Sequence, residues 1–151
     1  MKKKDPYTTH ITFTKEGEEV KRELKGELVD VLDLASDERG LSLIPQKTRV
    51  LCKNEIHELI TTDEVDAGPN KTVDRVAYIG FFEITQGGVV IVGDPLLING
   101  EDIGKIAGFD ATHFPNHYNI VVLSPKRLIG HEAGFHIGDE VTIGRRQPSA
   151  R

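Results

Sequence analysis

The stretch from Pro95 to Gly144 constrains the fold most, because short apolar runs alternate there with turn signals. Asn99-Gly100 is a pair that favours a two-residue type I′ hairpin turn, and Gly138-Asp139 marks another turn. Between them, the runs 103–109 and 118–123 have the length and β-branched content of strands. This pattern predicts a sheet in which short strands follow one another with little intervening chain.

The same stretch also predicts one short helix, from Ser124-Pro125 to about Gly134. Serine accepts hydrogen bonds from the unpaired N–H groups at a helix start, and proline fits the first helical position because it lacks that donor. Leu128 and Ile129 would then face inward, and a left-handed glycine commonly ends a helix. The alternation at 140–143 predicts a final strand.

The earlier part of the chain contains further strand patterns. Residues 19–35 fit either a helical stripe or a strand, and we favour a strand over 27–34. Asn54 is a residue that caps helices, so the apolar positions after it predict a second short helix. The other predicted strands cover residues 7–14, 41–44, 47–52 and 72–84.

Paired glycines in Gln86-Gly87-Gly88 predict a hairpin, since glycine adopts positive φ without strain. The run 89–92 that follows is apolar on both faces, which predicts a central strand or one covered on both sides.

Composition agrees with a β-rich chain of one domain, 1–151, with mobile tips at 1–6 and 145–151. The 15 glycines suit many tight turns, and 38% hydrophobic residues suffice for one core. A net charge of −5, with basic clusters only at the tips, argues against a nucleic-acid partner. No apolar run approaches membrane-spanning length and no leader opens the chain, so we expect a cytoplasmic protein without membrane contact.

The order of several motifs points to a known family. They are Ile98-Asn99-Gly100, Thr112-His113 with Pro115, Ile120, Pro125 with Leu128, and Gly138-Asp139-Glu140-Val141 with Ile143. This succession, over about a third of the chain, resembles the C-terminal half of the archaeal CTP-dependent riboflavin kinases. The resemblance implies an all-β fold: a single closed or nearly closed β-barrel of the cradle-loop type, with one or two short helices, in a prokaryotic protein.

The N-terminal kinase motifs of that family are absent here. The chain has no G-x-G-x-G segment, and its nearest approach to the family's magnesium-binding run is 45–50, with Arg49 or Val50 where asparagine is needed. Mg²⁺ prefers hard oxygen ligands, and an arginine would repel it. A flavin or a nucleotide therefore remains a possible ligand, while Mg²⁺ is not expected.

The resemblance also implies that the polar loop 110–116 borders a nucleotide and flavin pocket. Thr112 and Asn116 would hydrogen-bond a ligand there, and His113 would stack on it or donate to it; Asn99 and Ser124 complete the predicted ligand-binding set. A structural interpretation stays equally open, in which the loop side chains satisfy nearby backbone groups.

A metal site formed by Asp110, His113 and His117 is a weaker alternative. Pro115 disfavours the helix that would bring the two histidines together, and on an extended chain they would lie roughly 13 Å apart.

Three functional hypotheses follow. The first is a small-molecule-binding barrel with a nucleotide or flavin site. The second is a riboflavin-kinase-like phosphotransferase with an altered phosphate loop, although no catalytic motif is present. The third is a structural or regulatory module that forms a homodimer.

Overall fold

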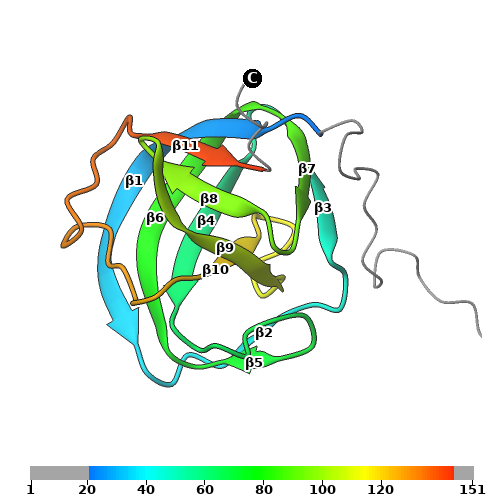
Figure 1. The fold of residues 1–151 in the computed structure, drawn as a ribbon, viewed down its shortest axis with the longest axis vertical. Helices are drawn as coiled ribbons and strands as arrows, with labels where there is room; N and C mark the ends of the chain where they lie inside the picture. The colour runs from blue at the N-terminus through cyan, green and yellow to red at the C-terminus, as the bar shows by residue number, and fades with distance from the viewer. Residues whose placement is uncertain (1–20, 145–151) are drawn as a thin grey trace, which may run out of the picture.

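The computed structural model describes residues 21–144, whose strands build one closed β-barrel and two small sheets (Figure 1). Seven strands form the barrel in the order β1, β11, β8, β9, β10, β4, β6, and the pairing of β6 with β1 closes the ring. Their bounds are β1 Leu24–Ser36, β4 Ile56–Thr62, β6 Val76–Gln86, β8 Pro95–Ile98, β9 Glu101–Asp110, β10 Asn119–Leu123 and β11 Glu140–Ile143. The small sheets pair β2 (Leu41–Ser42) with β5 (Thr72–Val73) and β3 (Thr48–Leu51) with β7 (Gly88–Ile91).

The predicted all-β barrel is therefore confirmed, and so is the strand preferred over 27–34, which lies within β1. Neighbouring barrel strands are antiparallel except β10 and β4, which run parallel. The Asn99-Gly100 turn forms as expected: both residues have positive φ, and Ile98 pairs with Glu101 across it.

Two apolar clusters hold the strands together. Leu59, Phe82, Phe109 and Val122 belong to the larger cluster, to which all seven barrel strands contribute. A second cluster joins β2 and β5 to the barrel through residues such as Ile60. Because strand residues alternate between faces, β4 contributes Leu59 to one cluster and Ile60 to the other.

Neither predicted helix forms within residues 21–144. In the segment after β10, the N–H of Leu128 donates to the Thr61 hydroxyl, and that of Gly130 donates to the Tyr78 carbonyl. These N–H groups donate to acceptors on β4 and β6 and not to carbonyl groups one turn earlier in their own segment. A single bond of helical spacing remains in this segment, from Ala133 N–H to Ile129 O. Figure 1 shows this segment as the orange strand-free trace alongside the barrel.

Asn54 does not cap a helix either. It has φ 78° in a tight turn closed by Glu55 N–H and Cys52 O, and the chain then enters β4. The β-branched residues after the turn pack on both faces between β10 and β6, which explains why the strand prevails over a short amphipathic helix.

The predicted hairpin at Gln86-Gly87-Gly88 is also absent. β6 is paired on one edge by β1 and on the other by β4, so it has no edge left for β7. β7 pairs instead with β3, outside the barrel, and Val89 is exposed. The run 89–92 is therefore not a central strand, but Val90 and Ile91, on alternate faces of β7, are both buried, in line with the alternative of a strand covered on both sides. The strand expected at 7–14 and the tips at 1–6 and 145–151 lie outside the described residues.

Candidate functional site

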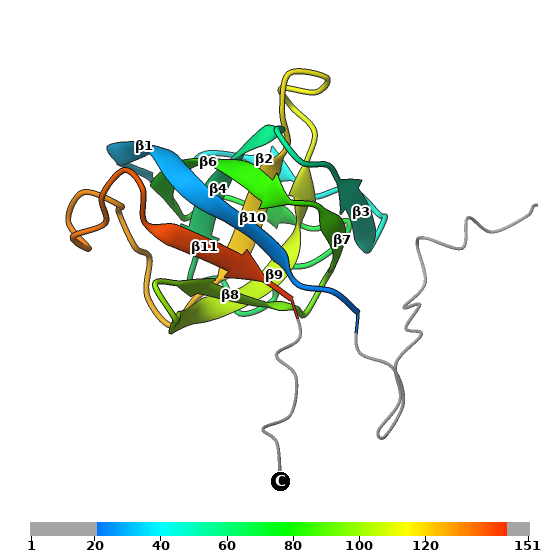
Figure 2. The same ribbon diagram turned by 90° about the horizontal axis from the view of Figure 1, so that it is seen from above.

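The loop 111–118 between β9 and β10 forms one wall of a cavity of about 450 Å³. Figure 2 shows this loop in yellow, projecting from the end of the barrel. The opposite walls come from β3, from the turn before β4 and from the start of β4. The polar residues around the cavity are Arg49, Glu55, His57, Asn116, His117 and Tyr118.

The backbone of the loop is held by short-range hydrogen bonds. Phe114 N–H donates to Ala111 O, while Asn116 N–H and His117 N–H both donate to His113 O. At its start, Thr112 N–H donates to the buried Asp110 carboxylate. These bonds turn the chain back on itself, which places His113 and His117 in a stack with ring centroids 5.1 Å apart.

His57 is buried and has both ring nitrogens engaged. Its Nδ1 accepts the Tyr118 N–H at 3.0 Å, so in the neutral ring the proton sits on Nε2, which lies 3.2 Å from Glu55 Oε1. Burial raises the pKa of Glu55, but hydrogen bonds from the Cys52 amide and the His57 ring outweigh it, and the net result is a lowered pKa. Glu55 is thus an ionised partner that orients His57.

Arg49 supplies a positive charge to the cavity wall. Its guanidinium lies 5.3 Å from the centre of the Tyr118 ring, a cation–π distance. One terminal nitrogen donates to Thr48 O and the other to Gln46 Oε1 at 3.4 Å, while the buried Nε finds no acceptor within residues 21–144. No carboxylate in that range forms an ion pair with Arg49, so its positive charge has no anionic partner there.

His117 links the cavity to a buried carboxylate behind it. Its Nδ1 lies 2.7 Å from Asn116 Oδ1, and its Nε2 lies 3.5 Å from Oε1 of Glu58, a residue with 7% of its surface exposed. Burial raises the pKa of Glu58 to about 7, against the opposing charge of Arg39. Burial, followed by the positive charges of His113 and His57, lowers the pKa of His117 despite an opposing hydrogen bond to Asn119.

Exposed apolar side chains border the cavity. Val50 is 70% exposed, Phe114 57% and Ile56 44%, and all three line it. Phe114 also lies 5.1 Å from Tyr118, ring centre to ring centre. Apolar side chains beside converging polar groups are typical of small-molecule sites.

The structure brings together only part of the predicted ligand set. Asn116 lines the cavity and His113 stacks on a residue that does, whereas the Thr112 side chain is exposed and not part of the lining. Ser124 lies at the other end of β10, beside a separate cavity of about 440 Å³, and its hydroxyl donates to Ile103 O. Asn99 is in the β8–β9 turn, where its side-chain carbonyl accepts the Glu140 N–H.

The alternative metal set does not assemble. Asp110 is buried and its carboxylate accepts the Thr112 N–H and the Asn119 side-chain amide. The two histidines stack through the loop turn and are not held apart on an extended chain, so that expectation is wrong. Among residues 21–144, no group of three or more His, Cys, Asp or Glu side chains could hold a metal ion.

Sequence reasoning missed His57, Glu58 and Tyr118 as site residues. The first two were placed on a predicted helix, where their positions suggested no common partner. The β-branched content of 56–62 was the available signal for a strand. In a strand, the adjacent residues His57 and Glu58 point to opposite faces, here at the end of β4 that borders the cavity.

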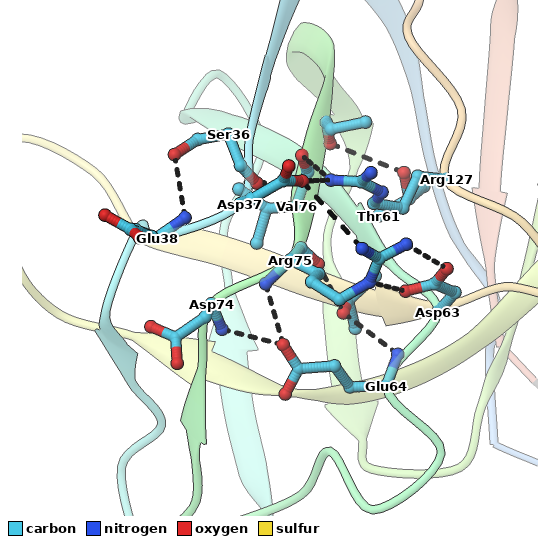
Figure 3. A network of polar contacts seen from close by, with 12 residues as sticks. Ser36, Asp37, Glu38, Thr61, Asp63, Glu64, Asp74, Arg75, Val76 and Arg127 are labelled. Carbon is cyan, nitrogen blue, oxygen red and sulfur yellow. Dashed lines mark hydrogen bonds and ion pairs between the residues drawn. The ribbon is translucent and has the colours of Figure 1, made fainter.

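A second polar network lies on the barrel surface and is structural. Figure 3 shows Arg75 between Asp63 and Asp37, with Arg127 beside Asp37. The Asp63 contact is bidentate at 3.0 and 3.1 Å, and it lowers the pKa of Asp63. These paired charges join the segments that follow β1, β4 and β10 to Arg75, just before β6.

Comparison with known proteins gives a family but no activity. The model of a family of unknown function, DUF6917, matches residues 18–144. No curated protein and no solved structure matches the chain. Within the described part of the chain, no helix has the length and hydropathy needed to cross a membrane.

Proposed function

We propose that the chain, which belongs to the DUF6917 family of unknown function, binds a small molecule carrying a flat ring and an anionic group. Nucleotides and flavin phosphates are the ligand class, and the cavity beneath the 111–118 loop is the site. The volume of about 450 Å³ lies within the range of small-molecule sites.

Arg49 is the observation that carries this proposal. A cationic group on the cavity wall beside an aromatic ring, with no carboxylate partner within residues 21–144, matches a ligand that has both an anion and a ring. The ring of Phe114, which lines the cavity and is 57% exposed, offers a surface for stacking, which favours planar ligands over flexible ones.

The residues around the cavity do not fit the Mg²⁺ that a riboflavin-kinase-like phosphotransferase would need. The carboxylate of Glu55 is engaged by the Cys52 amide and by His57, and the charge of Arg49 opposes a cation nearby. We therefore propose binding, and the phosphotransferase hypothesis would require FMN formation from riboflavin and CTP or ATP in the presence of Mg²⁺.

The test compares two ligands that differ only by a phosphate. Flavin fluorescence quenching should detect riboflavin and FMN binding, with CTP and ATP as competitors. Arg49→Gln should lower the affinity for FMN at least about tenfold, since charge-assisted hydrogen bonds contribute about 1.5–3 kcal/mol. The affinity for riboflavin, which has no phosphate, should change much less. Lys126→Gln, an exposed cation outside the cavity, is the matched control. The proposal fails if none of the four molecules binds, or if Arg49→Gln binds FMN as tightly as the wild type.

A further inference from the structure

We propose that a proton shared between Glu58 and His117 acts as a latch. It holds residues 113–118, one wall of the cavity, against the barrel strands, so that ligand access to the cavity changes with pH. This inference deepens the proposed function, because the latch acts on the same cavity, but its first test needs no ligand.

The orientation of His117 defines where the proton sits. Its Nδ1 faces Asn116 Oδ1, which can only accept, so Nδ1 carries a hydrogen. In the neutral ring, Nε2 then presents a lone pair toward Glu58 Oε1, 3.5 Å away, while the Asn119 side chain lies near enough to favour the protonated ring. One proton on either atom makes the contact attractive, whereas its loss leaves a carboxylate facing a lone pair.

The loop is tied to the barrel wall by the Tyr118 backbone, which bonds His57 Nδ1 and the Glu58 N–H, and by the His117 ring. The backbone N–H groups of Phe114, Asn116 and His117 donate within the loop itself. The ring, in contrast, packs edge-on against Phe81 of β6 at 5.1 Å and faces Glu58 of β4. Weakening the Glu58 contact therefore loosens the wall without breaking the backbone bonds of the loop.

The surrounding charges set the pH at which the proton leaves. Arg39, from the β1–β2 connection, favours the ionised form of Glu58, while His57 and His113 disfavour a charge on His117. On the β9 side, Asp110 lies behind Asn119 and accepts its amide. Burial is the largest effect on both groups, and a Glu58 pKa of about 7 puts the release near neutral pH. Because the two groups are coupled, the titration belongs to the pair.

The first test follows the loop by NMR as the pH is varied. His113→Gln is introduced into every protein so that the exposed imidazole adds no titration of its own. The amide signals of Asn116 and His117 should then shift with one midpoint near neutral pH. Glu58→Gln supplies a permanent N–H toward His117, so this midpoint should disappear and the low-pH spectrum should persist. Glu55→Gln, a carboxylate of the same cavity with a lowered pKa, should retain the midpoint.

The second test uses cytidine 2′,3′-cyclic monophosphate, whose single negative charge does not titrate near neutral pH. Its affinity should differ several-fold between about pH 6 and about pH 8 in the wild type, since a one-unit change in a linked pKa alters affinity up to about tenfold. In Glu58→Gln the two affinities should agree.

The outcomes separate the latch from the proposed function. A midpoint that persists in Glu58→Gln, or no midpoint between about pH 6 and about pH 8, overturns the latch. Equal affinity at both pH values in the wild type overturns its control of access. If the loop titrates as expected but the cyclic nucleotide never binds, the latch stands and the ligand class is wrong.

Discussion

Gly130 lies against the backbone carbonyl oxygen of Ile79 so closely that a Cβ atom at position 130 would overlap it. The Gly130 N–H also donates to Tyr78 O, which fixes the segment on β6. We expect Gly130→Ala to lower the free energy of unfolding by about 3 kcal/mol, because the surrounding backbone must shift to admit the methyl group. Urea denaturation measures this difference.

Gly134 is the matched control in the same segment. It has φ 82°, and apart from its chain neighbours no heavy atom lies within 4 Å of the position that a Cβ would take. Gly134→Ala should therefore cost only the left-handed strain of about 1 kcal/mol. Equal losses in the two variants would show that close packing at Gly130 is not the cause.

The sequence predicted the fold best where the local residue pattern alone determines the structure, without hydrogen bonds to distant parts of the chain. The Asn99-Gly100 turn needs only neighbouring residues, and it forms as expected. The helix after Ser124 failed because the acceptors of its N–H groups, Thr61 and Tyr78, are distant in sequence. The β6–β7 hairpin failed because local glycines cannot reveal that both edges of β6 are already paired.

The candidate site could be predicted only in part for the same reason. The loop carrying His113 and Asn116 has a recognisable polar pattern, and it does border a cavity. His57 reaches that cavity from β4, which its parallel pairing with β10 brings to the loop, and Arg49 reaches it from β3, which pairs with β7. No local pattern of residues encodes these pairings.

Asn99 provides a test of a structural role at a position that had suggested ligand binding. Its φ is 52°, and its side chain accepts the Glu140 N–H at 2.9 Å. Asn99→Gly should cost about 1 kcal/mol for the lost hydrogen bond, and Asn99→Ala about 2–3 kcal/mol because left-handed strain is added. Thermal unfolding ranks the variants, and FMN titration should show unchanged affinity. A weaker affinity in Asn99→Gly would restore the ligand role.

Thr61 anchors the segment that replaces the predicted helix. Its hydroxyl accepts the Leu128 N–H at 2.8 Å. Thr61→Val keeps the shape but leaves that N–H without an acceptor, which should cost about 1–3 kcal/mol. Thr61→Ser retains the hydroxyl and should cost less than about 1 kcal/mol for the lost methyl group. If chemical denaturation finds serine as damaging as valine, the methyl group and not the hydrogen bond matters.

Glu58 should make the stability of the protein fall as the pH rises. Its pKa increases from 4.5 to about 7 on folding, so the folded state holds the proton more tightly than the unfolded state. The resulting stabilisation is complete below the unfolded pKa and is lost as the pH rises through about 7. Each pKa unit corresponds to about 1.4 kcal/mol, so the full effect is about 3–4 kcal/mol.

Glu58→Gln removes this titration and Glu55→Gln removes one of opposite sign. Relative to the wild type, Glu58→Gln should therefore gain stability between about pH 4 and about pH 8. Glu55 has a lowered pKa, so its stabilisation is present above the unfolded pKa, and Glu55→Gln should lose stability over the same interval. Urea denaturation at both pH values measures the two differences. Parallel pH profiles for the wild type and Glu58→Gln would mean that folding does not raise the pKa of Glu58, and the Glu58–His117 pair would then share no proton near neutral pH.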